Sequence, residues 1–93
     1  MSVQIAFGTT AGTFTDTSTN AAGTEVPDTY TFTSTIDASV GTVNGDGTAT
    51  FTTVAGTFDV TATDPTGLSG TETFEYLADL APAAVGAPTF TAA

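Results

Sequence analysis

Carboxylates, hydroxyls and two tyrosines are the side chains in this sequence that could carry acid–base or nucleophilic chemistry. The chain has ten Asp and Glu residues and 24 Thr, and it contains no Lys, Arg, His or Cys. A nucleophilic Ser or Thr needs an adjacent base, usually His or Lys, so covalent catalysis by a hydroxyl is not expected here. A pair of carboxylates could still act as acid and base, as in glycosidases and aspartic proteases.

Two segments come closest to such a carboxylate site. Asp16-Thr17-Ser18 has an order found in aspartic-protease loops, but the glycine expected after the threonine is missing. We therefore interpret this segment as a polar loop. Glu72 and Glu75 are close in sequence, yet their odd spacing on a strand places them on opposite faces. The sequence predicts no catalytic residue, and we do not expect an enzyme.

Metal binding is the other chemistry that unpaired carboxylates could support. Asn44-Gly45-Asp46-Gly47 contains part of a calcium loop, but it lacks the further spaced carboxylates and the closing bidentate Glu of an EF-hand. The preferred interpretation is a hairpin turn. A weak site made by Asp59 with Asp64, or by Asp46 with a neighbouring chain, stays open. No metal ligand and no cofactor are predicted.

The charge of the chain excludes several classes of partner. The formal net charge is −10, and no basic side chain is present. Nucleic-acid binding needs cationic groups that displace counterions from phosphates, and an anionic membrane surface would repel this chain in the same way. No stretch approaches the roughly 20 apolar residues of a spanning helix. The first residues lack the pattern of a secretory signal, which favours production without export or removal of a signal.

The elements that would position these side chains are strands. From Gly47 to Tyr76 three short runs alternate apolar residues with Thr, Asp or Glu, and glycines or a Pro-Gly turn separate the runs. This period of two is typical of strands with one buried face. We expect an antiparallel three-strand meander with the following inward side chains: Ala49, Phe51, Phe58, Val60, Ala62, Phe74 and Tyr76.

The remaining chain predicts shorter elements on both sides of this meander. Asn44-Gly45 between alternating runs indicates a tight hairpin with left-handed backbone positions. The other expected elements are a first strand with Val3, Ile5 and Phe7 ending at Gly8, a loop over 16–24, a strand over 29–35 with Tyr30 and Phe32 inward, a brief strand over 40–43, a helical turn at 77–81 and a candidate terminal strand at 89–91.

Strands of this length, separated by turn signals, predict an all-β protein. We expect an immunoglobulin-like antiparallel β-sandwich with extended N- and C-terminal arms. The predicted organisation is N-terminal strands and an arm over 1–24, the sandwich core over 25–80 and an extended C-terminal arm over 81–93.

Two neighbouring motifs resemble the bacterial immunoglobulin-like (Big) domains. The first runs from Asn44 to Phe51 as a glycine-headed turn and a Thr/Phe strand, and the second runs from Val54 to Asp64 as an Ala-Gly turn and the strand TFDVTATD. The resemblance implies an immunoglobulin-like fold without common catalytic residues. Such domains occur in bacterial surface adhesins and in phage virion proteins, including capsid decorations and tail proteins.

The leading hypothesis is a capsid decoration (cement) protein on the outer surface of a phage virion, made in the host cytoplasm. Its expected partners are the major capsid protein or another shell subunit, and a homo-oligomer is a further expected association. Phe14, Val85 and Phe90 are the predicted interface residues, because they lie in weakly patterned arms. The alternatives are an adhesin module that binds protein or carbohydrate, and a self-assembling filament subunit whose arms donate strands.

Overall fold

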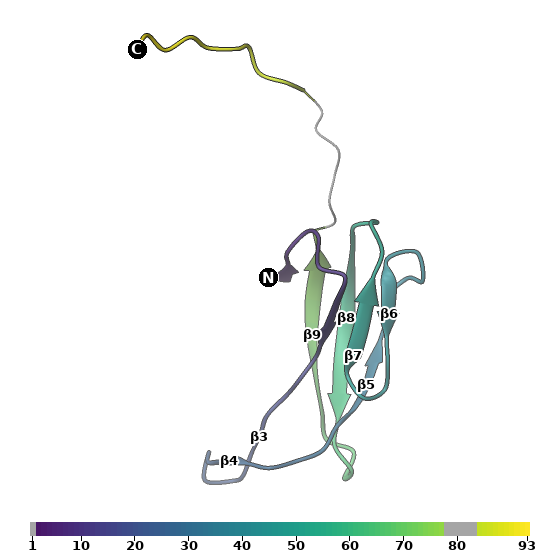
Figure 1. The fold of residues 1–93 in the computed structure, drawn as a ribbon. Coiled ribbons are helices and arrows are strands. Elements are labelled where there is room, and N and C mark those ends of the chain that lie inside the picture. Colours follow the sequence, from purple (N-terminus) through teal and green to yellow (C-terminus); the bar gives the residue numbers. More distant parts are fainter. Residues whose placement is uncertain (1, 78–83) are drawn as a thin grey trace.

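The computed structural model describes residues 2–77 and 84–93, which form strands, turns and extended chain without a helix (Figure 1). The strands are short, apart from two of eight residues. In chain order they are β1 (Val3–Ile5), β2 (Ala11–Thr13), β3 (Ser18–Thr19), β4 (Glu25–Val26), β5 (Thr31–Ser34), β6 (Gly41–Val43), β7 (Thr48–Phe51), β8 (Gly56–Thr63) and β9 (Ser69–Tyr76).

The strands form two larger sheets and one small hairpin. The four-stranded sheet has the order β1-β9-β8-β5, the three-stranded sheet has the order β2-β7-β6, and β3 pairs with β4. All pairs are antiparallel except β1 with β9, which is parallel. The expectation of an all-β protein is confirmed, but its sheets are not purely antiparallel.

The long hairpin of β8 and β9 supplies most of the core, as the alternation predicted. Phe58, Val60 and Ala62 are buried on β8, and Tyr76 is buried at the end of β9. The intervening positions carry Thr and Asp, which stay partly or fully exposed. A period of two therefore separates an apolar face from a hydrated face along β8 and over residues 73–76 of β9, whereas residues 69–72 are exposed on both faces.

Aromatic side chains from both larger sheets meet in this core. Phe51 of β7 stacks on Tyr76 of β9 with ring centroids 4.6 Å apart. Phe14, which follows β2, lies edge-on to Phe74 at 4.9 Å and to Phe58 at 6.4 Å. Because β2 and β7 belong to one sheet and β8 and β9 to the other, these contacts hold the two sheets together.

The predicted three-strand meander is wrong in one respect, because β7 does not pair with β8. It pairs with β6 and β2 in the other sheet. The connection that follows β7 crosses between the sheets, and Thr52 anchors it by donating from its backbone N–H to the Val40 carbonyl at 2.9 Å. Alternation in β7 revealed a buried face but not the sheet in which that face lies.

The hairpin at Asn44–Gly47 is confirmed, with a different residue in the left-handed conformation. Gly47 donates its N–H to the Asn44 carbonyl at 3.0 Å, and Gly47 has a φ of 93°. Asn44 and Gly45 do not have a positive φ. A Cβ on Gly47 would lie 2.5 Å from the Phe14 carbonyl oxygen, so the turn needs glycine at this position for space as well as for conformation.

The N-terminal region is more ordered than its sequence predicted. The expected loop over 16–24 contains β3, and a turn at Asn20 leads towards β4. The Asn20 side chain accepts the N–H groups of Ala22 and Thr24, both at 3.0 Å, and so fixes the turn. Phe7 was expected to face inward but is 66% exposed, because the chain turns at Gly8 with a φ of 81°.

The C-terminal region differs from the sheets. Of the predicted helical turn at 77–81 only Leu77 lies within the described residues, and it is not helical. Residues 84–93, called the tail below, are exposed throughout. The candidate strand at 89–91 is not formed in the single chain.

Candidate interaction surfaces

The body of the protein has two ends, which differ in the side chains that they expose. At one end, called the Tyr76 end, the Tyr76 hydroxyl reaches the carbonyl oxygens of Thr9 and Thr52, both at 2.8 Å. These bonds bring the loops at 6–10 and 52–55 together where β9 ends. Two apolar side chains of these loops are exposed, Phe7 at 66% and Val54 at 47%.

The opposite end, called the Asp64 end, contains the β8–β9 turn and the β3–β4 hairpin (Figure 1). Ser18 joins its parts, because its hydroxyl donates to Asp28 Oδ2 at 3.0 Å and also bonds to the Tyr30 hydroxyl. Four carboxylates lie on these segments, namely Asp16, Glu25, Asp28 and Asp64. This end is therefore rich in negative charge.

Three aspartates are used by their own turns. Each accepts through Oδ1 the backbone N–H and the hydroxyl of the residue two positions later, at 2.6–2.9 Å. The hydroxyl bond is the main cause that holds the pKa of each carboxyl below its usual value of 3.8, and for Asp64 the Leu68 amide and the Asp28 side chain contribute further. The pairs are Asp37 with Ser39, Asp46 with Thr48, and Asp64 with Thr66.

These turns account for the carboxylates considered as metal ligands. Asp46 belongs to its hairpin, and Asp59 accepts the Thr73 hydroxyl at 2.7 Å while Asp64 serves its own turn. Among residues 2–77 and 84–93 there is no group of three or more carboxylates placed to hold a metal ion. The remaining alternative, a weak metal site that Asp46 shares with a neighbouring chain, requires a second copy.

The segments considered for catalysis are placed as follows. Asp16 Oδ1 accepts the Thr17 N–H at 2.7 Å, and the Ser18 hydroxyl is engaged with Asp28, so this segment is a polar turn. On β9 the alternation puts Glu72 on the face of Tyr76 and puts Glu75 on the other face.

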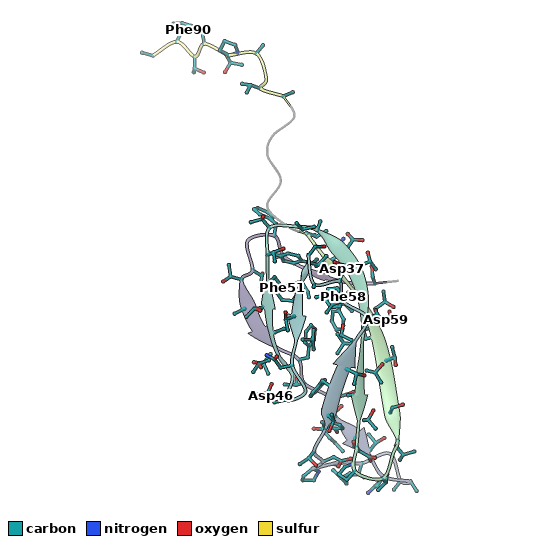
Figure 2. The ribbon with its side chains drawn as sticks, turned by 90° about the vertical axis from the view of Figure 1, so that its right-hand side faces the viewer. Asp37, Asp46, Phe51, Phe58, Asp59 and Phe90 are labelled. Atoms are coloured by element: carbon teal, nitrogen blue, oxygen red, sulfur yellow. The ribbon has the colours of Figure 1, made fainter. Side chains whose placement is uncertain are left out.

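The three predicted interface residues fall into two groups. Phe14 packs in the core against Phe58 and Phe74, and its N–H donates to the Gly47 carbonyl at 2.7 Å. Its side chain is thus already used within the chain. Val85 and Phe90 are 94% and 92% exposed, and Figure 2 shows Phe90 on the tail, apart from the body. The structure brings neither of them to Phe14.

Sequence reasoning missed the exposure of Phe7 and Val54. Phe7 belongs to an alternating apolar pattern and was interpreted as a strand residue, while Val54 was interpreted only as part of an Ala-Gly turn motif. The usable signal was the glycine that follows Phe7, since Gly8 takes a left-handed conformation and ends the strand pattern.

A further surface lies along β9. Its partner β1 covers only Phe74–Tyr76, while β8 pairs with all eight residues. Beside the uncovered part, a cavity of about 350 Å³ lies between the sheets. Its apolar lining comes from Phe14, Phe32, Val60, Ala62 and Phe74. The rest of its lining is Thr15, Asp16, Gly70, Thr71 and Glu72.

Comparisons with known proteins identify no relative. No protein-family model matches the chain, and neither a curated protein nor a solved structure does so. Within the described part of the chain, no helix is long and apolar enough to cross a membrane.

Proposed function

We propose that this chain is a non-enzymatic virion protein, a phage capsid decoration protein that binds the outer surface of the shell through its Tyr76 end. The observation that carries the proposal is the difference between the two ends of the body. Phe7 and Val54 are exposed at the Tyr76 end, where Asp37 and Glu75 also lie, while the Asp64 end has four carboxylates and one exposed large apolar side chain, Leu68. Such a molecule has one end suited to a contact and one suited to solvent.

Desolvation gives the physical reason for this orientation. Burying a carboxylate without a partner is costly, and this chain has no basic side chain that could neutralise one. An interface through the Asp64 end would desolvate several carboxylates at once. At the Tyr76 end, the carboxylate of Asp37 is already held by Ser39 through two hydrogen bonds. The shell subunit, such as the major capsid protein, would contact apolar side chains there.

The fold proposed for this module is an immunoglobulin-like sandwich. Its support is the strand order. In that fold one sheet contains second, fifth and fourth strands as neighbours, and the other contains the third, sixth and seventh. If β3 and β4 are left out of the count, β2, β7 and β6 become the second, fifth and fourth strands and are neighbours in one sheet. In the same count β5, β8 and β9 become the third, sixth and seventh strands and are neighbours in the other sheet. The two motifs that resemble Big domains fall on β7 and β8 with the turns that precede them.

The outer face of the four-stranded sheet fits the hydrated surface of an exterior protein. Thr33, Thr61 and Thr71 lie side by side on three neighbouring strands. The hydroxyls of Thr61 and Thr71 bond to each other at 2.8 Å, and a row of hydroxyls at such a face stays solvated. This face would point away from the shell or along it.

The test is co-sedimentation with shells purified without this protein. The wild-type chain should sediment with them at a fixed stoichiometry. Phe7→Asp and Val54→Asp each place a charge at the Tyr76 end and should weaken binding at least about tenfold, since each puts a carboxylate into an apolar contact. The matched control is Leu68→Asp, because Leu68 is 74% exposed at the Asp64 end and should tolerate the same charge.

Two outcomes would contradict the proposal. One is a wild-type chain that stays in the supernatant with every shell preparation from its source. The other is equal loss of binding in Leu68→Asp and Phe7→Asp, which would show that shell binding does not depend on the Tyr76 end.

A further inference from the structure

We propose that the tail of one copy adds as a strand to the open edge of β9 in a second copy, with Phe90 entering the cavity beside that edge. The inference goes beyond shell binding, because it concerns two copies of this chain alone. It rests on three features of the described residues: an unpaired strand edge, a partly apolar cavity next to it and an exposed segment with a strand pattern.

The edge of β9 is open from Ser69 to Thr73. The residues Ser69 to Glu72 are all exposed, and β1 begins to pair only at Phe74. The Thr73 N–H donates to the Glu72 side chain at 3.0 Å, so this amide points away from β8. In an antiparallel pair every second residue points the same way, which puts the backbone groups of Thr71 on the same edge. Such an edge is a template for another strand.

The position of Asp59 supports this assignment of the edge. Its N–H donates to the Thr35 hydroxyl at 2.9 Å, and its carbonyl accepts the Thr35 N–H at 3.1 Å, so its backbone faces β5. Asp59 lies opposite Thr73 in the register. This pair therefore makes no backbone bonds between β8 and β9, and the Thr73 groups must point outward.

The cavity lies where a side chain of the added strand would point. Half of its lining residues are aromatic or aliphatic, and Gly70 and Thr71 of β9 belong to the other half. Gly70 leaves the entrance wide, since a Cβ placed there would have only one neighbour, Asp16 Oδ2 at 3.8 Å. Successive residues of a strand point to opposite faces, so every second residue of an added strand would face this cavity.

The tail has the sequence pattern of a strand in this sheet. Thr89-Phe90-Thr91 repeats Thr31-Phe32-Thr33 of β5, in which Phe32 is 8% exposed and both threonines face solvent. Pro88 lacks an N–H and suits the first position of an edge strand. Phe90 is 92% exposed in the single chain (Figure 2). A strand pattern without a strand partner points to a partner outside the chain.

Charge favours the tail as the occupant of this edge. The chain carries −10, and residues 80–93 contribute no charged side chain. The tail can therefore approach Asp16 and Glu72 without adding another charged side chain. Val85 and Phe90 are 94% and 92% exposed, so neither side chain packs on its own body. A tail-to-edge contact is heterologous, so it generates a closed ring or an open chain of subunits.

A mixing experiment with two full-length variants tests the proposal. Thr71→Pro blocks the edge, because it removes an outward N–H while sparing the bonds to β8. Phe90→Asp disables the tail. Sedimentation equilibrium should show concentration-dependent association of the wild-type chain, at least about tenfold weaker association of either variant alone, and recovery as a one-to-one complex when the two are mixed.

The control is a mixture of Thr71→Pro with the double variant Thr71→Pro/Phe90→Asp, which has no open edge and should not associate. If Thr71→Pro does not fold, Phe90→Asp alone still decides, since the tail lies outside all sheets. Wild-type monomers at every concentration, or unchanged association of Phe90→Asp, would overturn the proposal. Protection of the β9 edge amides from hydrogen exchange at every protein concentration would also overturn the proposal, because the tail would then bind β9 of its own copy. None of these results depends on shell binding, which is measured separately.

Discussion

Four segments of this chain have the pattern Thr-Phe-Thr, and two of them, in β5 and in the tail, have completely different surroundings. In β5 the central Phe32 is 8% exposed, and the strand pairs with β8 over four residues. In the tail the central Phe90 is 92% exposed and belongs to no strand. The difference teaches that alternation decides which side chains share a face, while a neighbouring strand decides whether that face is buried. The account assigns the missing neighbour of the tail to another copy.

The largest expected effect separates these two phenylalanines. Phe32→Ala should reduce the free energy of unfolding by about 3–5 kcal/mol, because it empties a buried site. Phe90→Ala should leave it unchanged, since the dilute chain makes no described contact through this ring. Urea denaturation of dilute protein measures both. A loss above about 1 kcal/mol for Phe90→Ala would mean that the tail packs on its own body.

The next comparison concerns two glycines. Gly47→Ala should cost about 1–3 kcal/mol, because Gly47 has a φ of 93° and a Cβ there would lie 3.0 Å from the Phe32 ring. The matched control is Gly86→Ala in the tail, where a Cβ would have no neighbour within 4 Å. Thermal denaturation should lower Tm only for the first variant. Equal Tm values for the two variants would show that a side chain at position 47 does not disturb the packing of Phe32 in β5.

A smaller effect is expected at the Tyr76 end. Tyr76→Phe should cost about 1–2 kcal/mol, because the Thr9 and Thr52 carbonyls lose a shared donor while the ring remains packed. The free energy of unfolding, again from urea denaturation, checks this value. A neutral result would show that the two loops do not depend on Tyr76 for their position.

The smallest effect is a dependence of stability on pH. Hydrogen bonds in the folded turns lower the pKa of Asp37, Asp46 and Asp64, so each ionised carboxylate stabilises the folded state. This contribution is fully present above the usual value of 3.8 and is lost as the pH falls through the lowered folded values. Replacing Asp46 by Asn should flatten the fall in Tm at low pH relative to wild type. An identical dependence of Tm on pH in the variant and the wild type would exclude the Asp46 turn as a cause of the loss of stability at low pH.

The sequence predicted what depends on local pattern. The inward faces of β8 and β9 and the hairpin at Asn44–Gly47 were found, because period two and turn residues are local signals. The sheet that a strand joins does not follow from such local signals. The hairpin of β6 with β7 was predicted, but the assignment of β8 as the second neighbour of β7 failed, since that neighbour is β2, far away in the sequence. The parallel pairing of β1 with β9 joins opposite ends of the body sequence and had no signal at all.

The candidate surfaces show the same division. The weak pattern of the two arms singled out Val85 and Phe90 as interface residues, and both are exposed. It also singled out Phe14, which packs on Phe58 and Phe74 because β2 brings it across the core. The open edge of β9 could not be predicted, because it follows from the shortness of β1. The exposure of Val54 likewise depends on the turn between the sheets.

The central claim is that the tail becomes a strand on β9 of a second copy, and amide hydrogen exchange tests it most directly. The account predicts that the amides of Thr71 and Thr73 gain protection together with amides of the segment 89–91 as the protein concentration is raised, and that Phe90→Asp abolishes the gain in both segments. Amides in the tail that stay unprotected at every concentration, while the chain nevertheless associates, would contradict it.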